Sequence, residues 1–415
     1  MGRMGRRGNA GRAFRILAAL IGFTGLAACA EHPEPAPLPQ RESKAAPITR
    51  SPQGGFRTTL SVLTYNVAGL PWPVRTGRDS ALDQIGADLR RLREEGRAPD
   101  VVLLQEAFTS TAAHVGIRAG YPNWVRGPQT GDSSTIAAPA PDRAFLDDRS
   151  FWKGEGAGKL LPSGLYIFSA YPISQLHVTS FGKDTCAGYD CLANKGVMLA
   201  LVSIPGVPSP VQVLNTHLNS RGASGTPASR TLYAHKRQID EIRLFLNQHL
   251  RKELPFIYGG DFNTRKSPDR FSHKLAQIPG TLVHMYCLKT RGACDIRMSW
   301  DGDAPWLDTQ DLQGFAGGTS VRVRPIRVEA MFDAPAGVPR KSAARLSDHD
   351  GYLVTYELSW TAPPRARPVA SQQVPPTQLQ AVGSGRTTQQ LVASVATGIV
   401  VHTDKPVRLI AASAW

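Results

Sequence analysis

Several short apolar runs in this sequence have a polar residue able to do chemistry at one end. The runs span residues 60–66, 101–106, 211–217, 256–263 and 351–357. They are rich in Val, Leu and Ile and are bounded by Gly, Pro and Asp, which predicts β-strands. The polar residues at their ends are Asn66, Glu106, His217, Asp261, Asn263, Asp348 and His349. Neighbouring strands would gather these side chains at one sheet edge, where rigid scaffolds often carry their sites.

Further strand-like runs and two amphipathic stretches extend this pattern to about residue 360. Residues 164–169 and 196–203 have the same strand-like composition. Residues 80–95 and 229–250 place apolar side chains at helical spacing, with Leu82, Ile85 and Leu89 on one face of the first stretch. Strands that outnumber helices, with helices between some of them, predict a layered α/β sandwich.

The composition excludes some classes of protein. The chain has 415 residues, of which 41% are hydrophobic and 20% are charged, so wholesale disorder is excluded. Lys and Arg number 48 against 33 Asp and Glu, a formal net charge of +15. A basic chain favours encounter with anionic partners, but charge alone says nothing of chemistry.

Both ends of the chain differ in composition from its middle. A basic start leads into a short apolar run and Leu26-Ala27-Ala28-Cys29, which resembles the lipobox of a bacterial lipoprotein signal peptide. We expect a signal peptide at 1–28, a Pro-rich tether at 29–56 and a catalytic domain at 57–360. A Pro/Gln-rich linker at 361–389 and a small β appendage at 390–415 would follow. The expected location is the cell envelope, with Cys29 as an acylated outer-membrane anchor; an ordinary signal peptide cut nearby is the alternative.

The cysteines fit export. With Cys29 assigned to lipid, Cys186, Cys191, Cys287 and Cys294 remain, enough for two disulfides with three possible pairings. The local pairing joins 186 to 191 and 287 to 294. A zinc site is the rival, but no local ligand set is complete.

The strand-end motifs, taken in order, resemble the endonuclease/exonuclease/phosphatase superfamily over about residues 58–360. The motifs are the strand ending in Asn66, Gln105-Glu106, Thr216-His217, Gly260-Asp261-Phe262-Asn263 and Ser347-Asp348-His349. The resemblance implies a four-layered α/β sandwich of two packed mixed β-sheets flanked by helices. It also implies phosphoester hydrolysis with a divalent metal, usually Mg²⁺, with Mn²⁺ or Co²⁺ as substitutes.

Two further segments are similar to the bacterial sphingomyelinase and phospholipase C branch of that superfamily. These are residues 163–173 and the turn Asn194-Lys195-Gly196. The branch implies hydrolysis of sphingomyelin to ceramide and phosphocholine by a monomer at a phospholipid or sphingolipid surface. Branch members carry an aromatic-tipped hairpin before Ser-Asp-His, whereas residues 333–341 here contain no aromatic residue.

The resemblance also suggests a role for each residue. Glu106 would bind the metal, supported by Asn66 and Asp261, because hard cations prefer oxygen ligands. His349 would be the general base, with Asp348 and Glu329 orienting it. Asp261 would help to place the water, and Asn263 and Asn66 would contact the phosphate. His217 would donate a hydrogen bond to the developing oxyanion, and Lys195 would contact the phosphate.

Two other functions compete with this prediction. An exported non-specific endonuclease would use the same metal chemistry, with Arg322, Arg324, Arg327, Arg340, Lys341 and Arg345 along a groove for nucleic acid. A lipid-tethered binding protein without turnover would keep the fold alone. The intact set of strand-end residues disfavours this last alternative.

Overall fold

A computed structural model of the chain describes residues 44–51, 54–71, 74–290, 292–297, 310–333 and 345–361. The predicted signal peptide, Cys29, most of the linker and the C-terminal appendage lie outside these residues. Within the described ranges, no helix is both long enough and apolar enough to span a membrane.

The first sheet contains most of the predicted strands. Its order is β11 (Asp295–Arg297), β13 (Arg322–Met331), β14 (Gly351–Trp360), β2 (Phe56–Asn66), β3 (Val101–Gln105), β5 (Tyr166–Ser169) and β4 (Asn123–Arg126). The edge strand β1 (Thr49–Arg50) pairs with the start of β2. β2 and β3 are parallel, whereas β14 is antiparallel to β2, so the sheet is mixed.

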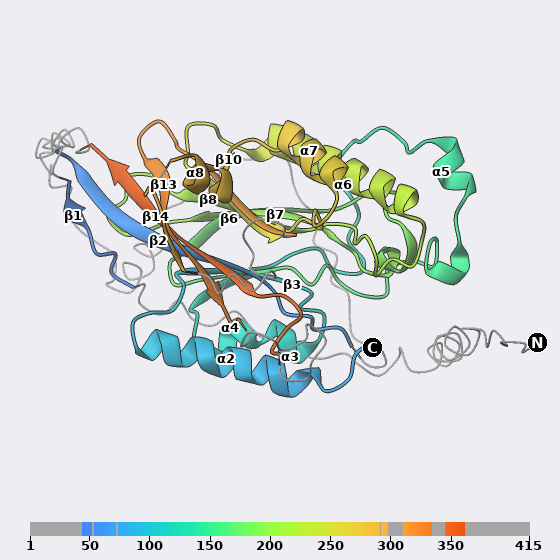
Figure 1. The fold of residues 1–415 in the computed structure, drawn as a ribbon, viewed down its shortest axis with the longest axis horizontal. Coiled ribbons are helices and arrows are strands. Elements are labelled where there is room, and N and C mark those ends of the chain that lie inside the picture. The colour runs from blue at the N-terminus through green and yellow to red at the C-terminus, as the bar shows by residue number, and fades with distance from the viewer. Residues whose placement is uncertain are drawn as a thin grey trace, which may run out of the picture. The chain divides into compact units, whose positions relative to one another are not determined.

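The second sheet is also mixed. Its order is β10 (Thr281–Leu282), β12 (Asp311–Ala316), β9 (Phe256–Asp261), β8 (Val211–His217), β7 (Gly196–Val202) and β6 (Ile173–Ser180). β8 and β9 run parallel, and the other neighbours are antiparallel. Figure 1 shows the two sheets packed between two layers of helices, which confirms the predicted four-layered α/β sandwich.

Helices cover the outer face of each sheet (Figure 1). α2 (Arg78–Glu94), α3 (Ser110–Ala113) and α4 (Val115–Arg118) cover the first sheet, and α6 (Ala228–His249) and α7 (Pro268–Gln277) cover the second. α8 (Val283–Lys289) follows β10, and α5 (Arg143–Asp147) and the short 3₁₀ helices η2 (Phe151–Lys153) and η3 (Gly188–Leu192) lie in connections. The predicted helical stretches correspond to α2 and α6. α2 buries Leu82, Ile85 and Leu89, the face that the sequence predicts.

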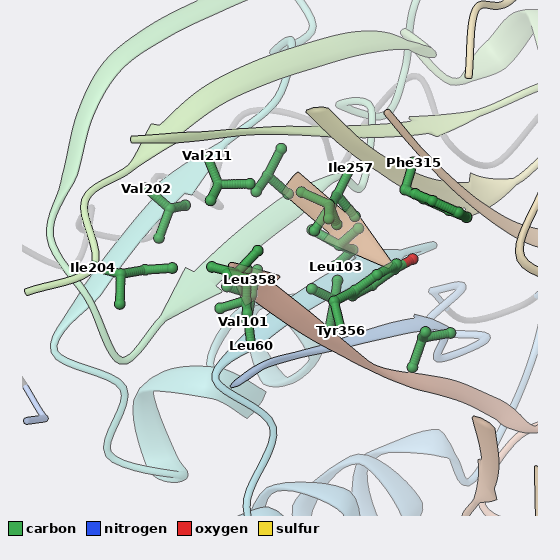
Figure 2. Packing of buried hydrophobic residues seen from close by; sticks show 14 of the residues in the cluster. Leu60, Val101, Leu103, Val202, Ile204, Val211, Ile257, Phe315, Tyr356 and Leu358 are labelled. Atoms are coloured by element: carbon green, nitrogen blue, oxygen red, sulfur yellow. The ribbon is translucent and has the colours of Figure 1, made fainter. Parts of the chain in front are cut away.

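The main core lies between the two sheets. Figure 2 shows Val101 and Leu103 of one sheet packed toward Val211 and Ile257 of the other. All four side chains are fully buried. Burying one such side chain contributes about 1.5–3 kcal/mol, so this layer is the main stabiliser of the strand ends that carry the polar residues.

The last part of the predicted tether is packed against the fold. Thr49 pairs with Arg57 in the β1–β2 ladder, and Lys44 Nζ lies 3.1 Å from Oδ1 of Asp100. Asp100 also accepts a hydrogen bond from the backbone N–H of Ser61. Residues 44–51 therefore contact the first sheet. They do not belong to an unpacked tether of the kind predicted for residues 29–56.

Both disulfides are the local ones that the sequence favours. Cys186 bonds Cys191, and Cys287 bonds Cys294. The alternative of a zinc site at these cysteines is excluded, because a disulfide sulfur is not a thiolate ligand. Two disulfides indicate an oxidising compartment outside the cytoplasm.

Candidate active site

The topology brings the predicted strand ends together. β2 and β3 are parallel with Asn66 opposite Gln105, so Glu106 follows at the same edge. β8 and β9 are parallel with His217 opposite Asp261. β14 runs antiparallel to β2, which places its start, directly after His349, beside the end of β2. Both sheets therefore deliver their polar ends to one place, as the sequence predicts.

Two carboxylates and an amide form the centre of the site. The Nδ2 of Asn66 donates a 3.0 Å hydrogen bond to Oδ2 of Asp261, and Asn66 also hydrogen-bonds the side chain of Glu106. The Oδ1 of Asn66 accepts from the backbone N–H of Ala68 at 3.0 Å. Nε2 of His217 lies 3.5 Å from Oδ2 of Asp261 and 3.9 Å from Oε1 of Glu106. Asn66 thus fixes the two carboxylates relative to each other.

The backbone at Glu106 is unusual. Its φ is 54°, in the left-handed region that a non-glycine residue rarely adopts. Such conformations persist where the surrounding structure imposes them, often at functional sites. Here the carbonyl of Glu106 accepts a 3.0 Å hydrogen bond from the N–H of Gly69, which holds the turn.

The carboxylates carry more negative charge than their protein surroundings stabilise. Burial raises the pKa of Glu106, although His349 and Lys195 act against it. Burial also raises the pKa of Asp261, and the neighbouring carboxylate of Asp311 adds to this. A bound cation would offset both effects. The residues therefore fit a divalent metal, with carboxylate oxygens of the kind that Mg²⁺ prefers.

A buried group of potential ligands includes Asp261, Asp311 and His349, whose ligand atoms lie within 4.8 Å of one another. Asp311 and His349 are already bonded to each other, through Oδ2 and Nδ1 at 2.7 Å. Asp311 therefore also serves His349, and the expected role of Glu106 as a metal ligand beside Asp261 stays a prediction.

The orientation of His349 corrects the sequence prediction. The partner of its Nδ1 is Asp311, at the start of β12, and neither Asp348 nor Glu329. Asp348 pairs with Arg75 at 2.5 Å, and Glu329 lies on β13 with Arg297 at 3.9 Å. Burial by itself would lower the pKa of His349, but Asp311 and then Asp261 outweigh it and raise the pKa to about 10.

Lys195 lies behind His217 and is not open to the substrate, contrary to the sequence prediction. Its ammonium bonds Asp190, the carbonyl of Leu218 at 3.0 Å and Nε2 of His217 at 3.1 Å. An ammonium has three N–H donors, and these three partners match them. Burial and then the charge of Lys195 lower the pKa of His217, so the imidazole is neutral. Lys195 therefore positions His217.

Asp190 and Arg270 support the same side of the site, and the sequence patterns gave no signal for either. Asp190 accepts from the hydroxyls of Ser220 and Ser224, each at 2.5 Å, and thereby holds the loop after β8. Arg270, 1% exposed, donates to the carbonyls of Asn219 and Asn263 at 2.7 and 3.1 Å. Both act through the backbone of the loops, a role that residue type alone does not reveal.

Asn263 lies where the sequence places it, beside Asp261. Its backbone N–H donates to Oδ1 of Asp261 at 2.9 Å, and its Nδ2 donates to the carbonyl of Leu218 at 3.0 Å. Its φ of 49° is one that asparagine tolerates better than most residues. The phosphate contact expected of Asn263 stays a prediction.

The sequence of residues 63–328 matches the model of the Endonuclease/Exonuclease/phosphatase family. The chain belongs to this family. Family membership agrees with the four layers of the fold and with the acidic and histidine residues at the sheet edge. The family and the buried carboxylate and histidine side chains indicate metal-dependent hydrolysis of phosphodiesters. No curated protein matches the sequence.

Solved structures similar to this family member include a bacterial beta toxin and a bacterial sphingomyelinase C. A beta toxin from Staphylococcus aureus is 18% identical, with a TM-score of 0.50 over 71% of this chain and 99% of that one. A double mutant of beta toxin from the same organism, with bound magnesium ions, is 17% identical, with a TM-score of 0.50 over 73% and 100%. Sphingomyelinase C from Streptomyces griseocarneus is 19% identical, with a TM-score of 0.49 over 72% and 99%. The beta toxin structures share the fold of this chain, and identities of 17% and 18% leave the substrate open.

Proposed function

We propose that this protein is a Mg²⁺-dependent phosphodiesterase of the phospholipase C type that hydrolyses sphingomyelin to ceramide and phosphocholine. The observation that carries the proposal is the turn Asn194-Lys195-Gly196, the motif of the sphingomyelinase branch. This turn joins the site directly, because Lys195 contacts Nε2 of His217. The Mg²⁺-bound beta toxin and the sphingomyelinase fold among its structural neighbours are in line with the same activity.

Each group of the site has a task in this reaction. A metal held by Glu106 and Asp261 would supply neutralisation of the phosphate charge. His349, oriented by Asp311, would take the proton from the attacking water in its neutral form, and the positive charge of a metal at Asp261 would lower the raised pKa of His349 toward the range where that form is populated. Asn263, whose backbone N–H donates to Asp261, would contact a phosphate oxygen through its side-chain amide, and His217 lies beside the same carboxylate, with Nε2 3.5 Å from its Oδ2. Asn66 keeps the two carboxylates in place through its amide.

A substrate panel tests the proposal. Sphingomyelin, phosphatidylcholine and duplex DNA are each offered with Mg²⁺ and with a chelator, and Glu106→Gln serves as the control for contaminating activity. We expect Mg²⁺-dependent release of phosphocholine from sphingomyelin by the wild type only. Cleavage of DNA with no release from either lipid would replace the proposal with the nuclease alternative.

Three of the basic residues that a nuclease would use, Arg324, Arg327 and Arg345, have acidic partners, whereas Arg322 at the start of β13 is exposed. Arg324 Nε lies 2.9 Å from Oε1 of Glu357, and Arg327 Nε lies 3.2 Å from Oδ2 of Asp295. Arg345 is 5% exposed and pairs with Asp350. Arg340 and Lys341 lie outside the described residues. Arg324 and Arg327 would have to give up these ion pairs to bind phosphates, and Arg345 is buried, so these three residues give the nuclease alternative little support.

We further propose that acylated Cys29 tethers the protein to the outer membrane, in keeping with the disulfides of an oxidising compartment. The motive is the sequence Leu26-Ala27-Ala28-Cys29 after a short apolar run. Cys29→Ser should move the protein from the membrane fraction to the soluble fraction. A wild-type protein that is already soluble, with an N-terminus elsewhere, would overturn the anchor.

A further inference from the structure

An aromatic surface lies outside the site described above. Phe151 and Trp152 in η2 are 63% and 68% exposed, and Leu160 is 56% exposed. The two aromatic rings contact each other edge to face, with centroids 6.0 Å apart. We name Phe151, Trp152 and Leu160 the aromatic loop surface. Large apolar side chains grouped in this way in water usually mark a binding surface.

The loop that carries this surface is anchored from below. The carboxylate of Glu155, 3% exposed, accepts from the backbone N–H groups of Ser150 and Gly188, at 2.8 and 2.7 Å. The guanidinium of Arg230 on α6 donates two hydrogen bonds to the same carboxylate, from Nε at 2.8 Å and from Nη2 at 2.9 Å. Figure 1 shows α5, which precedes the loop, beside the end of α6. The aromatic side chains therefore project from a fixed support.

The same loop is joined to the active site. The backbone N–H of Leu160 donates to the carbonyl of Leu192 at 2.7 Å, and the N–H of Asn194 donates to the carbonyl of Leu161 at 2.9 Å. Lys195, the next residue, contacts His217. A short hydrogen-bonded connection thus runs from the aromatic loop surface to the catalytic centre.

We propose that the aromatic loop surface docks the enzyme on a phospholipid bilayer. The proposal rests on the proposed function, since a lipid substrate is presented only at such a surface. It also assigns the membrane contact to a different segment from residues 333–341, which have no aromatic residue.

The chemistry of the surface favours a bilayer over a protein partner. A stable protein interface buries about 800 Å² on each side, which is more than three side chains provide. Trp is suited to the boundary between head groups and acyl chains, because its ring is apolar and its N–H is polar. Lys153 follows Trp152 directly in the sequence. Exposed Lys183 is also close to this segment, because its neighbour Asp184 pairs with Arg149 at 2.6 Å. These lysines can meet lipid phosphates.

The nearby acids do not oppose this contact. Asp147 and Asp148 are 70% and 81% exposed, and both lie 3.6 Å from an arginine, Arg143 and Arg230 respectively. The charge next to the aromatic loop surface is therefore close to balanced. We expect apolar insertion to dominate over attraction to anionic lipid, and vesicles of zwitterionic lipid to bind.

The test measures partition onto phosphatidylcholine–sphingomyelin vesicles in the presence of a chelator, so that no hydrolysis occurs. The full chain with Cys29→Ser is the common background, which removes acylation from every variant. Trp152→Ala and Phe151→Ala should each weaken partition by about tenfold, the effect of withholding one aromatic side chain from an apolar phase. Leu288→Ala, in α8, is the matched control for Leu160→Ala, because Leu288 is 55% exposed.

Two outcomes overturn the docking surface. One is a wild-type background that does not bind vesicles, and the other is equal binding by the aromatic variants and the Leu288→Ala control. Hydrolysis of sphingomyelin in detergent micelles is measured separately. Its absence would overturn the proposed function while the vesicle partition data still judge the docking surface.

Discussion

Oδ2 of Asp311 lies 2.7 Å from Nδ1 of His349, although the two residues are 38 positions apart in the sequence. The contact depends on the pairing of β12 with β9, which sets Asp311 opposite Asp261. A carboxylate on Nδ1 fixes the tautomer of the imidazole, and Nε2 lies 2.8 Å from Nε2 of Gln310 and 3.9 Å from Oδ2 of Asp261. The site thus has an Asp–His pair that places the proton-transfer atom next to the predicted metal ligands.

The first prediction concerns Asp311→Asn. Loss of its negative charge removes the main influence that raises the pKa of His349, so that pKa falls. The acid limb of the pH–rate curve should therefore move to lower pH, and turnover should fall by ~10²-fold because the base is less well oriented. Stopped-assay rates across a pH series measure both effects.

Glu329→Gln is the matched control for this change. Glu329 is the acid that the sequence motif suggests, yet it lies on β13, 3.9 Å from Arg297 of β11. Its pH–rate curve should overlay that of the wild type. A shifted limb in Glu329→Gln and an unshifted one in Asp311→Asn would reverse the assignment.

The misplaced acid shows what strand-end patterns contain and what they leave out. Asn66, Glu106, His217 and Asp261 could be predicted, because the ends of parallel strands meet at one sheet edge whatever the loops do. Asp311 could not, because it begins an antiparallel strand and reaches the site only through its register with β9. The sequence offers no periodicity from which that register can be read.

Glu106→Gln is the second prediction. A neutral amide binds a hard cation much more weakly than a carboxylate does, so Mg²⁺ affinity should fall by at least about tenfold. Isothermal titration of the folded proteins with Mg²⁺ measures it, with Glu329→Gln as the control that keeps wild-type affinity. Equal affinity in Glu106→Gln and the wild type would remove Glu106 from the metal site.

The third prediction concerns Lys195→Met. This variant distinguishes a Lys195 that positions His217 from a Lys195 that binds the phosphate. Because the ammonium contacts His217 Nε2 and the carbonyl of Leu218, its loss should lower kcat by about tenfold or more with little change in KM. A phosphate contact would instead raise KM. Steady-state kinetics on micellar substrate distinguish the two, and a rise in KM alone would contradict the positioning role.

The burial of Lys195 is the other feature that sequence reasoning left unresolved. A lysine in an Asn-Lys-Gly turn suggests an exposed cation. In the structure Lys195 is only 6% exposed and forms an ion pair with Asp190. Asp190 lies in η3, and in the sequence it stands between Cys186 and Cys191, which form a disulfide. Side-chain direction in such a short helical turn is set by tertiary contacts that no local pattern encodes.

Acid stability gives the fourth prediction. Burial would raise the pKa of Asp190, but Lys195 and then the hydroxyls of Ser220 and Ser224 outweigh it and lower the pKa to about 2. A depressed carboxyl pKa stabilises the fold above the unfolded value near 4, and this contribution of ~2 kcal/mol is lost as pH falls from about 4 to about 2. Urea unfolding at several pH values measures it.

Asp190→Asn should have a flatter dependence of the free energy of unfolding on pH in that window. Glu253→Gln, a change at an exposed acid, is the control and should keep the wild-type slope. The same slope in Asp190→Asn as in the wild type would show that the pKa of Asp190 is not depressed.

The turnover of micellar sphingomyelin by His349→Ala, measured at saturating Mg²⁺ across a pH series, shows whether His349 is the general base. We expect a fall of ~10² to 10⁴-fold, the usual contribution of one positioned proton-transfer group, and loss of the acid limb of the curve. Substrate binding should change little, because Glu106, Asp261 and Asn263 remain. Near-wild-type turnover, or an unchanged acid limb, would contradict the assignment of His349 as the base and direct attention to His217.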